Sequence, residues 1–128
     1  MNWFYFTAAA PALLVGLVHS VLGEQLIFSR MRQGGLVPTN GARLIGAGHV
    51  RILWASWHIV TVFGGCIAAI LFWLAQAPPS AAHAFVANAI VICMFLCAVL
   101  VFVGTRGRHP GWVGLLSVAV LTWLGSMQ

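Results

Sequence analysis

The chain has 128 residues, of which 62% are hydrophobic and 5% charged, and its formal net charge is +5. Its mean hydropathy is +1.02. A soluble domain usually carries about 25% charged residues, so these values exclude a soluble globular protein and favour an integral membrane protein.

Four apolar segments follow one another along the chain. They cover residues 3–28, 52–75, 84–103 and 112–127, and the last is short. A helix of roughly 20 apolar residues crosses about 30 Å of hydrocarbon. Glycine and proline separate the segments, and continuous apolar runs exclude the alternating pattern of a barrel strand. We therefore predict an all-α protein in which residues 1–128 form a single domain, a bundle of four transmembrane helices.

The first segment lacks the basic start of a cleaved signal peptide. It opens Met-Asn-Trp-Phe-Tyr-Phe, and Ala8 to Ala10, which resemble a cleavage site, come too early. We interpret it as a retained helix with Trp3 and Tyr5 as interfacial anchors.

The basic residues indicate the orientation. All six are arginines, and the connection over residues 76–83 contains none of them. They fall in or beside the first and third connections: Arg30, Arg32, Arg43, Arg51, Arg106 and Arg108. In a four-helix chain these connections share one side, which the positive-inside rule makes cytoplasmic. We predict a bacterial inner-membrane protein with both termini periplasmic, and no nucleic-acid binding, because topology accounts for the positive charge.

Polar residues in the first segment form two sets with helical spacing. Gly16, His19 and Gly23 share one face, and small residues allow close helix packing. Ser20 and Glu24 lie one turn apart on a neighbouring face, and Glu24 is the only acidic residue in the chain. Ionisable residues inside a membrane usually face protein or water, and we expect His19, on the face of the two glycines, to point into the bundle.

A polar stripe begins at Arg51, just before the second segment. It runs through Trp54 or Ala55 to His58, and Thr61 and Gly65 continue it. His19 lies about 7 Å deeper than Glu24, and His58 about 10 Å deeper than Arg51, at 1.5 Å per residue. We therefore expect two layers, Glu24 with Arg51 near the cytoplasmic boundary and His19 with His58 beneath them.

The third connection reads Gly-Thr-Arg-Gly-Arg-His-Pro-Gly-Trp over residues 104–112. Arg106, Arg108 and His109 precede a helix that Pro110 opens, and the positive end of a helix attracts anions. This segment is either an anion-binding cradle or an ordinary basic turn with Trp112 as an interface anchor.

Several ligands fit these residues. Histidines from two helices, His19 and His58, can hold a haem b iron or another metal ion, with Glu24 as a hard ligand and arginines for the propionates. The same site can bind the anionic head of a lipid-like ligand. Alternatively, the histidines only pack, and Glu24 and Arg51 form a structural ion pair.

The three cysteines, Cys66, Cys93 and Cys97, all lie in predicted spans. Cys93 and Cys97 are one turn apart and could bind a soft ion such as Cu(I). We favour the interpretation that they are small packing residues.

Three other functions stay open. A four-helix chain with one membrane glutamate resembles the small multidrug resistance exporters, which implies a proton-coupled transporter acting as a dimer. The layout is also similar to membrane glutathione transferases and leukotriene synthases, with Arg30, Arg32 and Arg51 in the corresponding places. The Asn and Glu of that family are absent, however, so no catalytic residue is carried over and we lean away from an enzyme. The third is an accessory subunit of a larger membrane complex, since the Gly- and Ala-rich faces suit oligomers.

Overall fold

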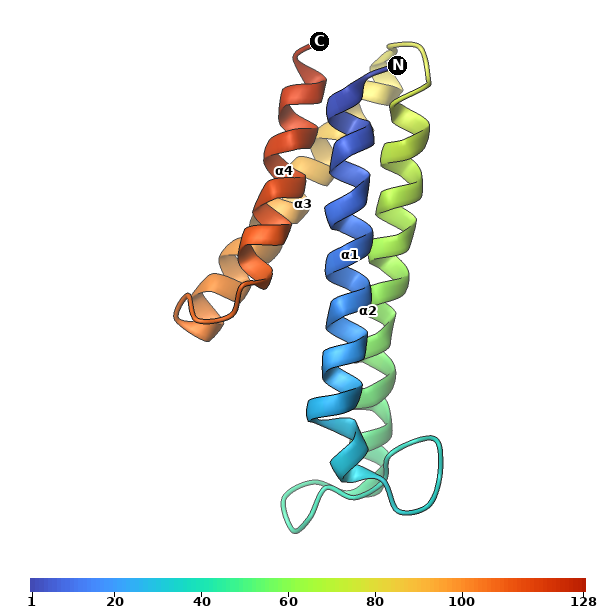
Figure 1. Ribbon diagram of the computed structural model, residues 1–128, viewed down its shortest axis with the longest axis vertical. Helices are drawn as coiled ribbons and strands as arrows, with labels where there is room; N and C mark the ends of the chain where they lie inside the picture. The colour runs from blue at the N-terminus through green and yellow to red at the C-terminus, as the bar shows by residue number, and fades with distance from the viewer. The chain divides into compact units, whose positions relative to one another are not determined.

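The computed structural model describes all 128 residues, and every regular element in it is helical. The α-helices are α1 (Trp3–Leu26), α2 (Ala47–Leu74), α3 (Ala81–Thr105) and α4 (Gly111–Ser126), and a short 3-10 helix, η1 (Phe28–Met31), follows α1 (Figure 1). There is no strand, which confirms the predicted all-α class.

Three of the helices, α1, α2 and α3, are long and apolar enough to cross a membrane. The fourth, α4, is apolar but has only 16 residues. At 1.5 Å per residue α4 is about 24 Å long, against roughly 30 Å of hydrocarbon. Length and composition thus support a membrane protein with three candidate spans, and the fourth span stays a prediction.

The helix ends differ from the predicted ones where polar residues continue a helix. The largest difference is at α2, which begins at Ala47 instead of residue 52 and so includes His49 and Arg51. Backbone hydrogen bonding does not require apolar side chains, so a helix extends past its apolar run. At the end of α1 the chain tightens into η1, and Phe28, the predicted last residue of the span, belongs to that turn.

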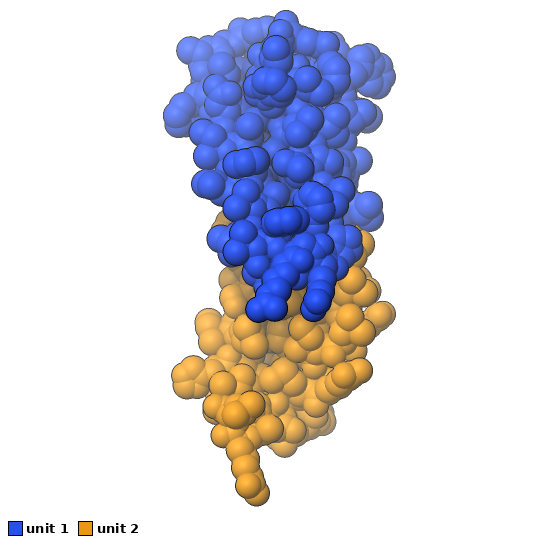
Figure 2. All heavy atoms as spheres, turned by 90° about the vertical axis from the view of Figure 1, so that its left-hand side faces the viewer, with its two compact units in different colours: residues 1–15, 64–128 blue, residues 16–63 orange.

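The chain divides into two compact units (Figure 2). The first comprises residues 1–15 and 64–128, and the second comprises residues 16–63. The long helices α1 and α2 each contribute to both units. That all four helices form one domain stays a prediction.

In the first unit, small residues let large ones pack closely. Tyr5 is 1% exposed and lies against Gly125, where an added Cβ would come within 2.8 Å of the ring. The Asn2 side chain donates a hydrogen bond of 2.7 Å to the Gly125 carbonyl, which brings the two chain ends together. The other buried apolar residues of this unit are Ala8, Ala12, Ala68, Leu71, Leu74, Ala75, Ala87, Ile90, Met94, Ala98, Val118 and Ala119.

Candidate functional site

In the second unit, two glycines of α1 allow α2 to come close, one to its backbone and the other to the indole of Trp57. A Cβ added at Gly16 would lie 3.3 Å from the Cα of Thr61, and one at Gly23 would overlap the indole of Trp57. The Thr61 hydroxyl donates to the Gly16 carbonyl at 2.7 Å. The expectation that the face of Gly16 and Gly23 packs against another helix is therefore confirmed, and the neighbour is α2.

This close packing brings the side chain of Glu24 into a polar cluster. Arg32, in the segment after η1, forms an ion pair with Glu24 Oε1. Glu24 Oε2 accepts a hydrogen bond of 3.2 Å from the indole N–H of Trp54 and lies 3.6 Å from His58 Nε2. The side chains of Glu24, Arg32 and His58 are 28–30% exposed, so the cluster is half-buried.

The other ring nitrogen of His58 is fixed by a chain of hydroxyl groups. Ser20 Oγ lies 2.8 Å from His58 Nδ1 and 2.6 Å from Thr61 Oγ1. Thr61 has a single hydroxyl proton, which it donates to the Gly16 carbonyl. Ser20 must therefore donate its own proton to Thr61 and accept one from His58.

The direction of this chain assigns the tautomer of His58. Nδ1 carries a proton because it can meet Ser20 only as a donor. Nε2 is buried without a hydrogen-bond partner and faces the Glu24 carboxylate. Without a proton on Nε2, a lone pair would point at a carboxylate oxygen, whereas a proton there would direct an N–H group at Glu24 Oε2.

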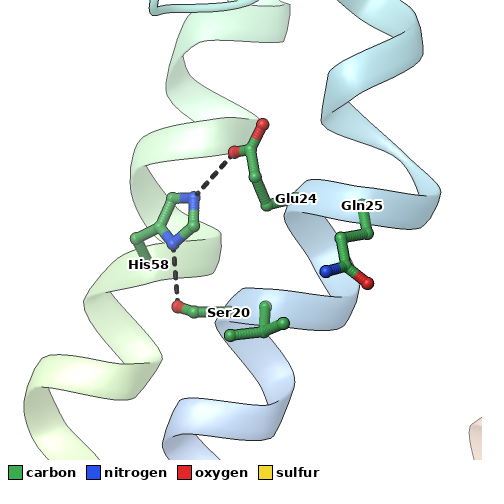
Figure 3. A pocket seen from close by; sticks show the side chains of 5 residues that line it. Ser20, Glu24, Gln25 and His58 are labelled. Atoms are coloured by element: carbon green, nitrogen blue, oxygen red, sulfur yellow. Dashed lines mark hydrogen bonds and ion pairs between the residues drawn. The ribbon is translucent and has the colours of Figure 1, made fainter.

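An open groove lies beside this cluster. It has a volume of about 310 Å³ and is lined by Ser20, Val21, Glu24, Gln25 and His58. Figure 3 shows Ser20 and Glu24 pointing from α1 toward the ring of His58 on α2. The exposed part of its wall is largely apolar. The groove thus joins an apolar surface to a charged, hydrogen-bonded cluster.

His19 belongs to an aromatic group formed by residues of α1, η1 and α2. Its ring stacks on the indole of Trp57, with centroids 4.3 Å apart and an angle of 9°. Trp57 also donates to the His19 carbonyl at 3.0 Å, and Phe28 meets the same indole edge-on. The observed partners of His58 are Ser20 and Glu24, so a ligand held between His19 and His58 stays a prediction.

Arg51 does not form the expected pair with Glu24. The Glu24 carboxylate is paired with Arg32 instead, and Arg51 is exposed on the second turn of α2. The predicted partner, Arg51, was wrong, because η1 turns the chain after α1 and brings Arg32 back toward Glu24. Trp54 and His58, predicted on the same stripe, do reach Glu24.

Arg106, Arg108 and His109 belong to the first unit and form the turn between α3 and α4. Arg106 adopts a left-handed conformation with φ of 52° and caps the end of α3. His109 Nδ1 accepts from the backbone N–H of Gly111, the first residue of α4, at 3.0 Å. The backbone N–H of Gly111, which would be the first donor to a bound anion, is therefore already bonded within the turn. The side chains of Arg106 and Arg108 are exposed. Whether the turn binds an anion stays a prediction.

No group of three or more His, Cys, Asp and Glu side chains is placed to hold a metal ion. The cysteines Cys66, Cys93 and Cys97 are free thiols.

The sequence pattern missed Arg32 as a member of the site. Its signal is proximity in the chain, because Arg32 follows the only acidic residue by eight positions, across the end of the apolar run. Ser20 and Thr61 had the correct helical spacing, but only the structure shows that the Ser20 hydroxyl meets both His58 and the Thr61 hydroxyl.

The chain matches no protein-family model, no curated protein and no solved structure.

Proposed function

We propose that this chain is a small inner-membrane protein that binds an anionic, lipid-like ligand together with a proton at the cluster of Glu24, Arg32 and His58. In this proposal all four helices cross the membrane and both termini are periplasmic. The arginine distribution supports the orientation. A short helix such as α4 can span where the bilayer thins around it.

The observation that carries the proposal is the orientation of the His58 ring. Its Nδ1 is committed to Ser20, and its Nε2 faces Glu24 at 3.6 Å without a hydrogen bond. Histidine is the side chain that ordinarily changes charge between pH 5 and 8. A proton on Nε2 adds a positive charge to a cluster in which Arg32 already neutralises Glu24.

The sign of that charge indicates the kind of ligand. With His58 protonated, two positive groups surround one carboxylate, and Arg32 Nε is a buried donor with no partner. The neighbouring connection adds Arg30 and Arg43, and the start of α2 adds Arg51. An anionic head group suits this excess of positive charge, and the apolar wall of the groove suits an alkyl chain.

Quenching of tryptophan fluorescence tests this proposal, because Trp54 contacts Glu24 and Trp57 packs on the same helix pair. The full chain, with Trp3, Trp73, Trp112 and Trp123 replaced by Phe, is placed in phosphatidylcholine nanodiscs. A dibrominated alkyl sulfate is then compared with the matching dibrominated alcohol. We expect the sulfate to quench at several-fold lower concentration, with an advantage that grows from pH 8 to pH 5.5.

Two arginine variants separate the site from general charge attraction. Arg32→Gln should lose most of the sulfate advantage, about fivefold for one arginine near a membrane surface. Arg32→Lys should keep part of it, and Arg30→Gln, which removes an equal charge nearby, should keep nearly all. His58→Gln should abolish the pH dependence. Equal quenching by sulfate and alcohol, or equal losses in Arg32→Gln and Arg30→Gln, would refute the proposal.

Haem or a metal ion remains an alternative ligand, and binding of either would displace the Ser20 or Glu24 contact of His58. An absorbance spectrum with elemental analysis of the purified protein tests it. A Soret band lost in both His19→Ala and His58→Ala would replace our proposal with a haem protein.

The transporter and the accessory subunit also remain proposals. A proton bound at His58, beside an open groove, would suit proton-coupled exchange, which requires a self-sufficient oligomer and a proton flux in proteoliposomes. An accessory subunit would instead co-purify with a stoichiometric partner and show no flux.

A further inference from the structure

A second groove lies in the first unit, between α3 and α4. It has a volume of about 200 Å³, and its exposed walls are apolar. Phe95, Ala98, Val99 and Phe102 line it from α3, and Trp112 and Leu116 line it from α4. The α3 residues follow the i, i+3, i+4, i+7 spacing of a single helix face, so the groove runs along the helix for about 10 Å.

One end of this groove meets the turn between the helices. Phe102 and Trp112 are in edge-to-face contact there, with centroids 5.2 Å apart. The indole N–H of Trp112 donates to the Gly107 carbonyl at 3.3 Å, and Gly107 stands between Arg106 and Arg108 in sequence. The apolar groove therefore ends directly at a turn that carries two exposed arginines.

These two arginines have no counter-charge within the protein. The only acidic side chain, Glu24, belongs to the second unit and is paired with Arg32 and His58. Neither Arg106 nor Arg108 forms an ion pair, and the backbone N–H of Gly111 is already bonded to His109. A negative charge for these guanidinium groups must come from outside the chain.

We infer that this groove binds an anionic phospholipid, with an acyl chain along Phe95 to Phe102 and the phosphate held by Arg106 and Arg108. Guanidinium groups bind phosphate with charge-assisted hydrogen bonds, and basic pockets between membrane helices recognise anionic head groups. The site is separate from the one beside His58 and does not depend on it.

Native mass spectrometry of the full chain in a mild detergent tests the inference. The probes are phosphatidylglycerol and phosphatidylcholine with identical acyl chains. We expect the wild type to bind phosphatidylglycerol at least tenfold more tightly. Each arginine should contribute about fivefold, so Arg106→Gln with Arg108→Gln should remove most of this preference. The matched double variant Arg30→Gln with Arg43→Gln, which removes the same charge from the second unit, should retain it.

A second pair of variants tests the groove itself. Val99→Trp fills the groove and should weaken binding of both lipids, whereas Leu100→Trp, at a highly exposed residue outside the lining, should not. Equal binding of the two lipids by the wild type would overturn the inference. So would unchanged phosphatidylglycerol binding in Val99→Trp, or a dimer whose second copy covers the groove and excludes lipid.

Discussion

Each of the two units of this chain is stabilised internally by a different kind of contact. The second unit has a network of hydrogen bonds between side chains, among Ser20, Glu24, Trp54, His58 and Thr61. The buried apolar side chains of that unit are Phe28, Pro38 and Val50, and the larger buried apolar cluster lies in the first unit. The comparison shows that a chain of nearly uniform hydropathy can combine a unit specified by polar contacts with one specified by shape.

The difference is consistent with the physics of helix association in lipid. Lipid tails are as apolar as leucine, so burial alone drives helices together weakly, and packing and hydrogen bonds decide the contact. The first unit uses close packing of alanine and glycine against Tyr5. The second unit uses glycine as well, but there the close approach serves to align donors and acceptors.

The largest expected effect comes from filling the contact between α1 and α2. Gly23→Ala would place a methyl group within the indole of Trp57, whose ring is fixed by His19 and Phe28. We expect a loss of about 2–3 kcal/mol in the free energy of unfolding, as for an overpacked core. Reversible unfolding in mixed micelles, followed by tryptophan fluorescence, measures it.

Gly48→Ala is the matched control for this change. Gly48 lies in α2 with open space around its Cα, so alanine should be neutral or slightly stabilising. A comparable loss in the two variants would show that the close approach at Gly23 is not what holds the second unit together.

The next effect concerns the ion pair. Glu24→Gln leaves Arg32 without a charged partner in a half-buried site, and should cost about 1–2 kcal/mol, less than a fully buried pair would. Arg32→Gln should cost a similar amount. If the pair acts as a unit, the double variant should be less destabilised than the sum of the two, and strict additivity would contradict that.

Two threonines provide the sharpest comparison of the units. Thr61→Val removes the hydroxyl that links Gly16 to Ser20 and should destabilise by about 1 kcal/mol. Thr122 is fully buried in the first unit, and its hydroxyl has no hydrogen-bond partner. Thr122→Val should therefore be neutral or stabilising by up to about 1 kcal/mol. If the two substitutions changed the free energy of unfolding by the same sign and size, the polar contacts would not distinguish the second unit from the first.

The smallest effect should come from Arg51. Its side chain is exposed and is not paired with Glu24, so Arg51→Gln should change the unfolding free energy by less than about 0.5 kcal/mol. A loss of stability as large as that of Arg32→Gln would instead support the pairing of Glu24 with Arg51 that the sequence predicts.

These outcomes reflect what a sequence can specify. The helix class and the three long apolar helices follow from the apolar runs, and the face of Gly16 and Gly23 follows from helical spacing. The partner of Glu24 could not be chosen in this way, because Arg32 lies beyond the helix and its position depends on the tight turn at η1. The tautomer of His58 depends on three hydroxyl and carbonyl directions, which spacing does not contain.

The pairing of Glu24 with Arg32 also bears on how the protein enters its membrane. A charged side chain in a spanning helix raises the cost of insertion by up to about 3 kcal/mol at the bilayer centre. The neutralising arginine follows Glu24 by eight positions and precedes α2, so the ribosome supplies it before the second helix is made. The charge of the Glu24 carboxylate can thus be neutralised by Arg32 during synthesis, before α2 and the later helices have been made.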